Sequence, residues 1–251
     1  MKFADIHSHI LPRFDDGAQN IKQSIKMLYN ADKAGTEIIT ATPHFFGPYE
    51  PKEEEVKQMT EKLNGAASDL GIGIRLVQGC EYRYSKKVMR VSREEGLITI
   101  NGNGYVLLDL PFSEEWAEGG RYEELVRDIG TLCQEYKGVV LAHPERYSAF
   151  VSKPDRAYDF VRSGVSIQCN AKSFTGGLLN RTTMTASWLV KNGLVTAVAG
   201  DSHSPTGERT PDLNPAYEII RKKFGEECAK TLMYDNPKRI INGTQVCPWE
   251  G

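Results

Sequence analysis

The sequence has few of the features that mark several common protein classes. Its 251 residues contain only five cysteines and five histidines, and no Cys-x-x-Cys pair. An odd number of widely spaced cysteines argues against a disulfide framework or a zinc finger. Cysteine-based phosphatases need an arginine six positions after the cysteine, and no cysteine here has one. We therefore expect small buried apolar side chains at Cys80, Cys133, Cys169, Cys228 and Cys247.

An excess of one charge and long apolar runs are also missing. The chain has 31 basic and 33 acidic residues and a net charge of −2, which gives no sign of a nucleic-acid or membrane-surface binder. Apolar stretches such as 194–200 are far shorter than the roughly 18 residues of a membrane span. The first residues run directly into a polar motif, so we expect no signal peptide and a cytoplasmic protein.

The chain does contain regular alternation of two patterns. Hydrophobic residues make up 40% and charged residues 25%, which excludes a disordered or collagen-like protein. Several short apolar, β-branched runs are continuous, as in strands buried on both faces of a parallel sheet. The predicted strands are Phe3–Ile6, Glu37–Ala41, Ile74–Gln78, Tyr105–Leu108, Val139–Ala142, Val165–Cys169 and Val195–Ala199.

Helical periodicity fills the segments between these strands. One helix is expected to start behind a cap at Asn20 and to end at Gly35, and another to start at Pro51 and run to about Leu70. Further helices are predicted at Ser85–Glu95, Tyr122–Tyr136, Pro154–Ser163, Leu178–Asn192, Asn214–Phe224 and Asn236–Asn242. With no linker or repeat visible, we expect a single α/β domain over 1–251, best fitted by a closed or nearly closed parallel barrel. A doubly wound open sheet is the alternative, although the Rossmann fingerprint and the P-loop are absent.

All five histidines lie at or just past the carboxyl ends of predicted strands, and carboxylates accompany them. The segments are Asp5-Ile6-His7-Ser8-His9, Asp15-Asp16-Gly17, Thr42-Pro43-His44, Gly79-Cys80-Glu81, Asp109, His143-Pro144-Glu145-Arg146 and Asp201-Ser202-His203. In parallel α/β folds these ends form one rim on which active sites are built. Imidazole nitrogen and carboxylate oxygen are ligands for divalent manganese, iron or zinc. A single His-x-His is weak evidence, but the joint pattern predicts a site for several metal ions.

These motifs resemble those of the polymerase and histidinol phosphatase (PHP) superfamily. The longer stretch His7–Pro12 followed by Asp15–Ala18 is similar to its bacterial protein-tyrosine phosphatase branch, the manganese-dependent enzymes of capsule and exopolysaccharide loci. The match is collinear from Asp5 to about Pro237. The resemblance implies a TIM-like, distorted barrel of seven β/α units with three divalent metal ions, for which manganese is expected and iron or zinc are accepted by the same ligands.

The resemblance also implies roles for individual residues. His7, His9, Glu81 and Asp201 would hold one metal, and Glu81 would bridge to a second that Asp109 and His143 complete. Asp16, His44 and His203 would hold the third. Arg146 and Arg209 would contact the substrate phosphate. Two positions depart from the family pattern: Asp109 replaces an expected glutamate, and the segment before Arg209 is a residue longer.

The implied reaction is hydrolysis of phosphotyrosine by a metal-activated hydroxide, with an autophosphorylated bacterial tyrosine kinase as the expected partner and no nucleic acid. A phosphoenzyme route would need an Asp-x-Asp motif, which the chain does not contain. Two alternatives remain open. One is another phosphoesterase of the superfamily, such as a histidinol-phosphate phosphatase or a nuclease. The other is a metal-binding regulatory module without catalysis. The oligomeric state is not predicted.

A few further side chains have two interpretations. Arg146 could instead form a surface ion pair with Glu145, which would contribute little. Aromatic residues after the rim motifs could stack on a phosphotyrosine ring or anchor loops on the fold; they are Phe45, Phe46, Tyr49, Phe112 and Trp116. Asn170 could bind near the substrate or cap a turn.

Overall fold

All seven predicted strands are present and parallel in the computed structural model, which describes residues 1–177, 179–247 and 249. Two short strands, β3 and β5, were not predicted. β1 and β6 are buried at every residue, as their continuous apolar sequences require. The strands are β1 (Phe3–Ser8), β2 (Thr36–Ala41), β3 (His44–Phe45), β4 (Arg75–Gln78), β5 (Glu81–Arg83), β6 (Tyr105–Asp109), β7 (Gly138–Ala142), β8 (Ser166–Asn170) and β9 (Val195–Ala199).

The strands form two sheets, and two interrupted strands run from the first sheet into the second. The orders are β1-β2-β4 and β3-β5-β6-β7-β8-β9. β3 continues the path of β2, and β5 continues that of β4, after breaks of two residues each. At the second break a Cβ on Gly79 would lie 2.8 Å from Thr40 Cγ2, so only glycine fits there. The backbone nitrogen of Glu81 donates to the Pro43 oxygen (3.0 Å) and carries the pairing across the break.

β9 returns to the side of β1. One parallel bridge joins Ser8 to Ser202, and the Asp201 nitrogen donates to the His7 oxygen (2.8 Å). Among the described residues no continuous ladder pairs β9 with β1. The structure therefore establishes a mixed α/β fold with parallel sheets, while closure into a seven-unit barrel stays a prediction.

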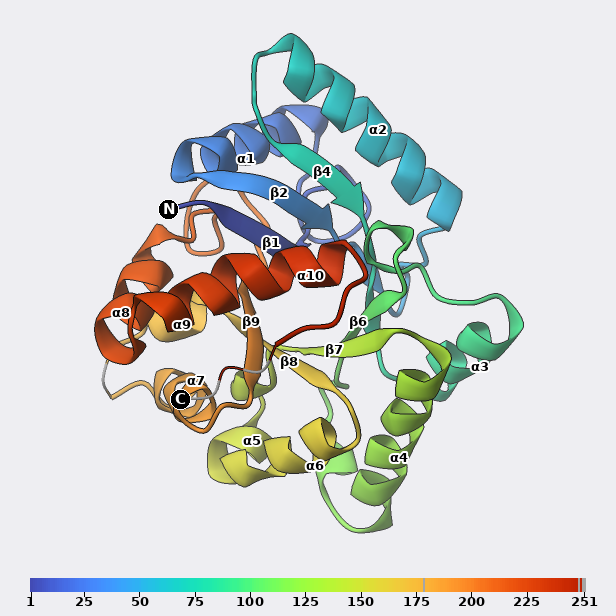
Figure 1. Cartoon of the computed structure of the whole chain (residues 1–251). Coiled ribbons are helices and arrows are strands. Elements are labelled where there is room, and N and C mark those ends of the chain that lie inside the picture. The colour runs from blue at the N-terminus through green and yellow to red at the C-terminus, as the bar shows by residue number, and fades with distance from the viewer. Residues whose placement is uncertain (178, 248, 250–251) are drawn as a thin grey trace.

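Of the helices, α1 and α2 lie over the first sheet and α4 to α7 lie around the second (Figure 1). They are α1 (Ile21–Ala34), α2 (Glu53–Asp69), α3 (Lys86–Glu94), α4 (Gly120–Glu135), α5 (Ser148–Ser152), α6 (Ala157–Arg162), α7 (Arg181–Lys191), α8 (Asn214–Phe224), α9 (Glu226–Lys230) and α10 (Asn236–Ile241). α5 and α9 were not predicted because five residues are too few to show a helical period. None of the described helices is long and apolar enough to cross a membrane.

Three predicted helix boundaries can be compared with the observed caps. Asn20 caps α1 by accepting a hydrogen bond from the Gln23 nitrogen, and Gly35 ends it with a φ of 95°. Both were predicted. α2 starts at Glu53 behind a cap at Lys52, whose backbone nitrogen donates to the Glu55 carboxylate (3.2 Å). Pro51 therefore precedes the cap instead of occupying the first turn.

The strands separate two apolar cores. The larger one lies between the strands and the outer helices, and the smaller one lies on the other face of the strands. Ala4, Ile6, Leu107 and Val140 belong to the smaller core because alternate residues of a strand face the same side. Ile240 and Ile241 of α10 close it, on the helix that crosses in front of the strands (Figure 1). The carboxyl ends of the strands are thereby left for polar side chains.

Candidate metal centre

The predicted ligands come together at the carboxyl ends of the strands. Eight of the nine fall into three groups of ligand atoms, and within each group the atoms lie within 4.8 Å of one another. The groups are His7, His9 and Asp201; His7, Glu81 and His143; and His9, Asp16, His44 and His203. The convergence of residues almost 200 positions apart follows from the parallel strand order.

The first predicted site adds the carboxylate of Glu81 to the group of His7, His9 and Asp201. His7 Nε2 lies 3.2 Å from His9 Nε2, 3.4 Å from Glu81 Oε1 and 3.5 Å from Asp201 Oδ1. His9 Nε2 lies 3.5 Å from Glu81 Oε2 and 3.4 Å from Asp201 Oδ1. All four side chains are buried. Nitrogen and oxygen atoms at these separations can surround one small cation.

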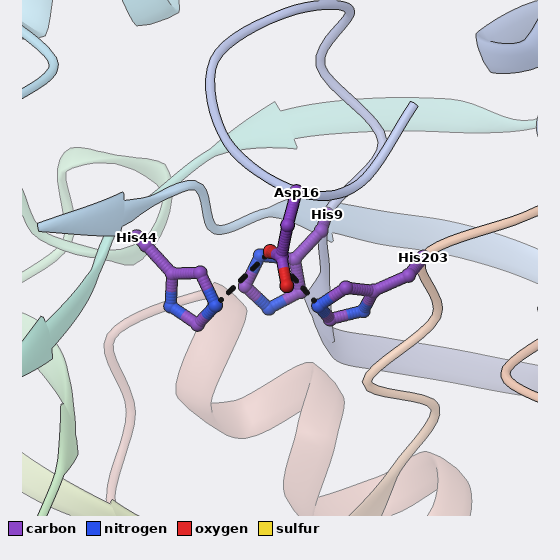
Figure 2. Close-up of side chains that lie close together, drawn as sticks. All are labelled: His9, Asp16, His44 and His203. Carbon is purple, nitrogen blue, oxygen red and sulfur yellow. Dashed lines mark ion pairs between the residues drawn. The ribbon is translucent and has the colours of Figure 1, made fainter. Parts of the chain in front are cut away.

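The third predicted group is equally close. Asp16 Oδ1 lies 3.4 Å from both His44 Nε2 and His203 Nε2, and the three side chains converge in Figure 2. His9 lies beside them, with its ring centroid 3.9 Å from that of His203. The structure therefore adds His9 to this group, a membership that the sequence did not suggest.

The second predicted group is only partly assembled. His143 Nε2 lies 3.0 Å from Glu81 Oε1, as expected for two ligands of one ion. Asp109 does not join them: its Oδ1 lies 3.7 Å from His143 Nδ1, and its Oδ2 is bound by the Arg83 guanidinium at 2.9 Å. Asp109 therefore stands outside the three groups in this arrangement, because Arg83 holds its carboxylate, and its role as a metal ligand stays a prediction.

Two side chains without a predicted role fix the histidine rings. Gln168 Oε1 accepts from His7 Nδ1 (2.8 Å), and Asp15 Oδ2 accepts from His9 Nδ1 (2.7 Å). Each contact leaves Nε2 of the ring free to bind a cation. Asp15 also accepts from the backbone nitrogens of Gly17 and His44, which holds the loop in place. Gln168 could have been found by its position two residues before Asn170, because both then share one face of β8.

Asp201 contacts both arginines that we predict to bind the substrate phosphate. Arg146 Nη1 lies 3.1 Å from Asp201 Oδ2, and the Arg209 guanidinium contacts Oδ1. The Arg209 backbone oxygen accepts from the nitrogens of His203 and Ser204, so its loop is anchored despite the extra residue. Asn170 donates to Asp201 Oδ2 (2.6 Å) and thus contacts a candidate ligand instead of capping a turn.

The alternative pairing of Arg146 with Glu145 is wrong. Glu145 is fully buried, and its Oε1 accepts from the Asn170 nitrogen (2.8 Å) and from Ser173 Oγ (2.7 Å). Glu145 therefore ties the turn that carries Arg146 to the end of β8, while the Arg146 side chain stays 44% exposed at the site.

Burial and charge set the protonation of the metal-free site. Burial would lower the pKa of His7, but the Glu81 and Asp201 carboxylates raise it to about 9. Burial likewise opposes charge on His44, but the adjacent Asp16 and Glu81 carboxylates raise its pKa to about 10. Burial and the charge of His9 lower the pKa of His203 to about 4. Protons on His7 and His44 thus balance the carboxylates where cations would otherwise do so.

The arrangement fits divalent cations. Four buried side-chain atoms of candidate ligands have no hydrogen-bond partner among the described residues, namely Nδ1 of His44 and of His143, Oε2 of Glu81 and Nε2 of His203. His44 Nδ1 and Glu81 Oε2 lie 2.6 Å apart but are not aligned as a hydrogen bond. Such orphaned atoms are costly unless something unseen binds them. The backbone is also strained here, since His143 and Asp201 have φ angles of 37° and 49°.

A cavity of about 440 Å³ opens over the centre. Besides candidate ligands, it is lined by Arg146, Arg209 and the rings of Phe46, Tyr49 and Phe112. Two other aromatic residues serve as anchors instead: Phe45 packs on Tyr82, and Trp116 is buried against Tyr147 and Phe150.

The cysteines take no part in this cavity. Cys80, Cys169 and Cys228 are buried as expected, and burial raises the pKa of each thiol. Cys133 is only half-buried and Cys247 is exposed, so the expectation of buried side chains is wrong for Cys247.

Known proteins are similar to this chain over nearly its whole length. Residues 3–242 match a family described as capsular polysaccharide synthesis, CpsB/CapC. The chain is 31% identical to the tyrosine-protein phosphatase YwqE of Bacillus subtilis, over 96% of this chain and 92% of the relative. It is 27% identical to the tyrosine-protein phosphatase CpsB of Streptococcus pneumoniae, over 94% and 97% of the two chains.

Solved structures extend the comparison. A chain described with YwqE of Bacillus subtilis and CpsB of Streptococcus pneumoniae as unique metal-dependent tyrosine phosphatases superposes with a TM-score of 0.87 and 28% identity, covering 98% of this chain and 96% of that one. A histidinol phosphate phosphatase from Lactococcus lactis superposes with a TM-score of 0.57 and 14% identity, covering 88% and 94%, and shares the fold.

Proposed function

The chain belongs to the CpsB/CapC family of capsular polysaccharide synthesis proteins, and from this premise we propose its reaction and the residues that perform it. It is a metal-dependent tyrosine-protein phosphatase, as its relatives are. The observation that carries the proposal is that three ligand groups lie together, and that members of two of them line one cavity with Arg83, Arg146 and Arg209.

We assign the residues by what they touch. His7, His9, Glu81 and Asp201 would hold one cation, and Asp16, His44 and His203 another; Glu81 and His143 would hold a third. Manganese is the proposed ion, and three per chain the proposed number. When bound, divalent cations lower the pKa of coordinated water and offset charge on phosphoryl oxygens. The structure supports this assignment through the buried ligand atoms that lack hydrogen bonds among the described residues.

Arg146 and Arg209 would bind the phosphate. Their guanidinium groups lie on the cavity wall, with side chains 44% and 36% exposed, so a phosphate can reach both. The planar fork of arginine donates two parallel hydrogen bonds to two phosphate oxygens. The phenolate that leaves from phosphotyrosine is a fair leaving group, so a strong protein acid is not required.

The substrate and setting are finer proposals. We propose that the substrate is a phosphotyrosine protein, specifically an autophosphorylated bacterial tyrosine kinase of a polysaccharide locus, and that the enzyme acts in the cytoplasm. The family's connection to capsular polysaccharide synthesis supports this choice. We also propose that residues 1–251 form one PHP-type domain whose strand paths close as a distorted TIM-like barrel. The contact of β9 with β1 and the enclosed smaller core support that closure.

The test is a substrate panel with purified protein. With manganese added, hydrolysis is expected for phosphotyrosine peptides, and a chelator should abolish it. His143→Gln should be inactive, while the matched thiol control Cys247→Ser, at an exposed position, should retain full activity. Activity confined to histidinol phosphate or single-stranded DNA would overturn the proposal.

A further inference from the structure

Arg83 and Asp109 form an ion pair between the neighbouring strands β5 and β6, at the edge of the candidate metal centre. Glu81, Tyr82 and Arg83 make up β5, and Arg83 is the register partner of Asp109 on β6. Because side chains alternate along a strand, Arg83 projects to the same side as Glu81. Arg83 Nε and Nη2 lie 3.0 and 2.9 Å from Asp109 Oδ2. One arginine therefore occupies this oxygen with two donors.

The other oxygen of Asp109 is also taken. Asp109 Oδ1 accepts from the Leu110 nitrogen (2.8 Å) and from the Tyr147 hydroxyl, which lies in short contact with it. Asp109 is 1% exposed, so water does not compete for these positions. With both oxygens bound by protein donors, the carboxylate has no free lone pair directed at His143, consistent with its absence from every ligand group.

Aromatic rings hold Arg83 in this position. Its guanidinium carbon lies 3.5 Å from the ring centroids of both Phe46 and Phe112. The Arg83 side chain is only 9% exposed. The two rings are nearly perpendicular to each other (84°) and confine the guanidinium from two sides, and a guanidinium fixed in this way is well suited to a buried carboxylate.

We propose that the Arg83 guanidinium neutralises Asp109 and withholds it from the cation site of Glu81 and His143. That site then lacks the Asp109 carboxylate and binds metal weakly. The other two groups keep complete ligand sets and bind tightly. The inference rests on the proposed metal-dependent function and adds which of the three metal ions is bound weakly enough to exchange. Arg83 is thus a positioning residue that sets metal occupancy, and Asp109 becomes a ligand only when Arg83 releases it.

The experiment counts metal ions. Wild type, Arg83→Gln, Asp109→Asn and the double variant are equilibrated over a range of free manganese, desalted and measured by atomic emission. In wild type we expect two tightly held ions. The third ion, at the site of Glu81 and His143, should be held at least about tenfold more weakly, because losing even a supporting contact of a metal site typically costs that much affinity. Arg83→Gln should tighten the third ion by about tenfold, because the freed carboxylate then needs a cation.

The double variant decides the reason for that gain. If the gain arises from the released carboxylate, adding Asp109→Asn to Arg83→Gln should return the third ion to its wild-type affinity. Asp109→Asn alone should leave the wild-type occupancy unchanged. Loss of an ion in Asp109→Asn alone, or an unchanged third ion in Arg83→Gln, would overturn the proposal.

A milder variant covers the case in which Arg83→Gln does not fold. Arg83→Lys keeps the charge but loses the planar fork, so the third ion should tighten partially; if affinity stays at the wild-type value, the proposal fails. Phosphatase activity toward phosphotyrosine is measured in parallel. Absence of turnover in wild type would contradict the proposed function while leaving the ion count to judge the role of Arg83.

Discussion

Replacing Gln168 by leucine tests how a buried amide orients His7, a candidate metal ligand. Gln168 is fully buried on β8, accepts from His7 Nδ1 (2.8 Å) and donates to Asn170 Oδ1 (2.8 Å). Asn170 in turn donates to Asp201 Oδ2 (2.6 Å). One amide therefore connects candidate ligands that are almost 200 residues apart in the sequence.

The expected magnitude follows from these contacts. Leucine has a similar volume but leaves the His7 Nδ1–H and the Asn170 oxygen without partners, each at about 1–3 kcal/mol. The additional apolar burial returns about 1–2 kcal/mol, so we expect a net loss of about 2 kcal/mol in the free energy of unfolding. The larger effect is on metal binding. His7 loses the contact that fixes its tautomer, and affinity should fall 10- to 100-fold, the range seen for such supporting contacts.

The assay is manganese titration against a chelating dye, with urea unfolding on the same samples. Gln168→Glu is the matched variant, because a carboxylate still accepts from His7 Nδ1 but cannot donate to Asn170. It should recover most of the lost metal affinity. If leucine lowered stability while metal affinity stayed at the wild-type value, or if glutamate failed to restore affinity, the orienting role of Gln168 would be refuted.

Three further predictions follow from the site and the core. Asp16→Asn should remove one manganese per chain in the ion count without loss of fold, since Asp16 Oδ1 faces His44 and His203 (3.4 Å each). An unchanged count would contradict a cation site formed by these three residues. The metal-free chain should lose stability as the pH rises from about 6.5 through the raised pKa values of His7 (about 9) and His44 (about 10), because their protonated forms favour the folded state; urea midpoints that stay level from pH 6 to pH 10 would refute this. Ile240→Ala, in the smaller core, should cost about 2–4 kcal/mol in urea unfolding but leave the ion count unchanged.

The sequence predicted what local pattern determines. Apolar runs located seven strand paths, and the exits of those strands located the histidines, because the parallel order brings carboxyl ends together wherever the strands lie along the chain. Two-residue β3 and three-residue β5 were not predicted, since so short a segment carries no alternation. They matter nonetheless, because His44 and Glu81 stand on them.

Side-chain partners could not be predicted in the same way, because they depend on register and not on composition. Gln168 reaches His7 across 161 residues: its place on the Asn170 face of β8 points to the rim, but no feature of either segment identifies His7 as its partner. Arg83 is different: it stands two positions after Glu81, and the alternation of β5 would have placed it at the rim had that strand been predicted. The carboxylate at 109 was chosen as a ligand by its position at a strand exit. The arginine opposite it decides whether that carboxylate faces a metal or a guanidinium. A ligand set inferred from the ends of strands can therefore be judged only after the arginine and lysine side chains near each carboxylate have also been located.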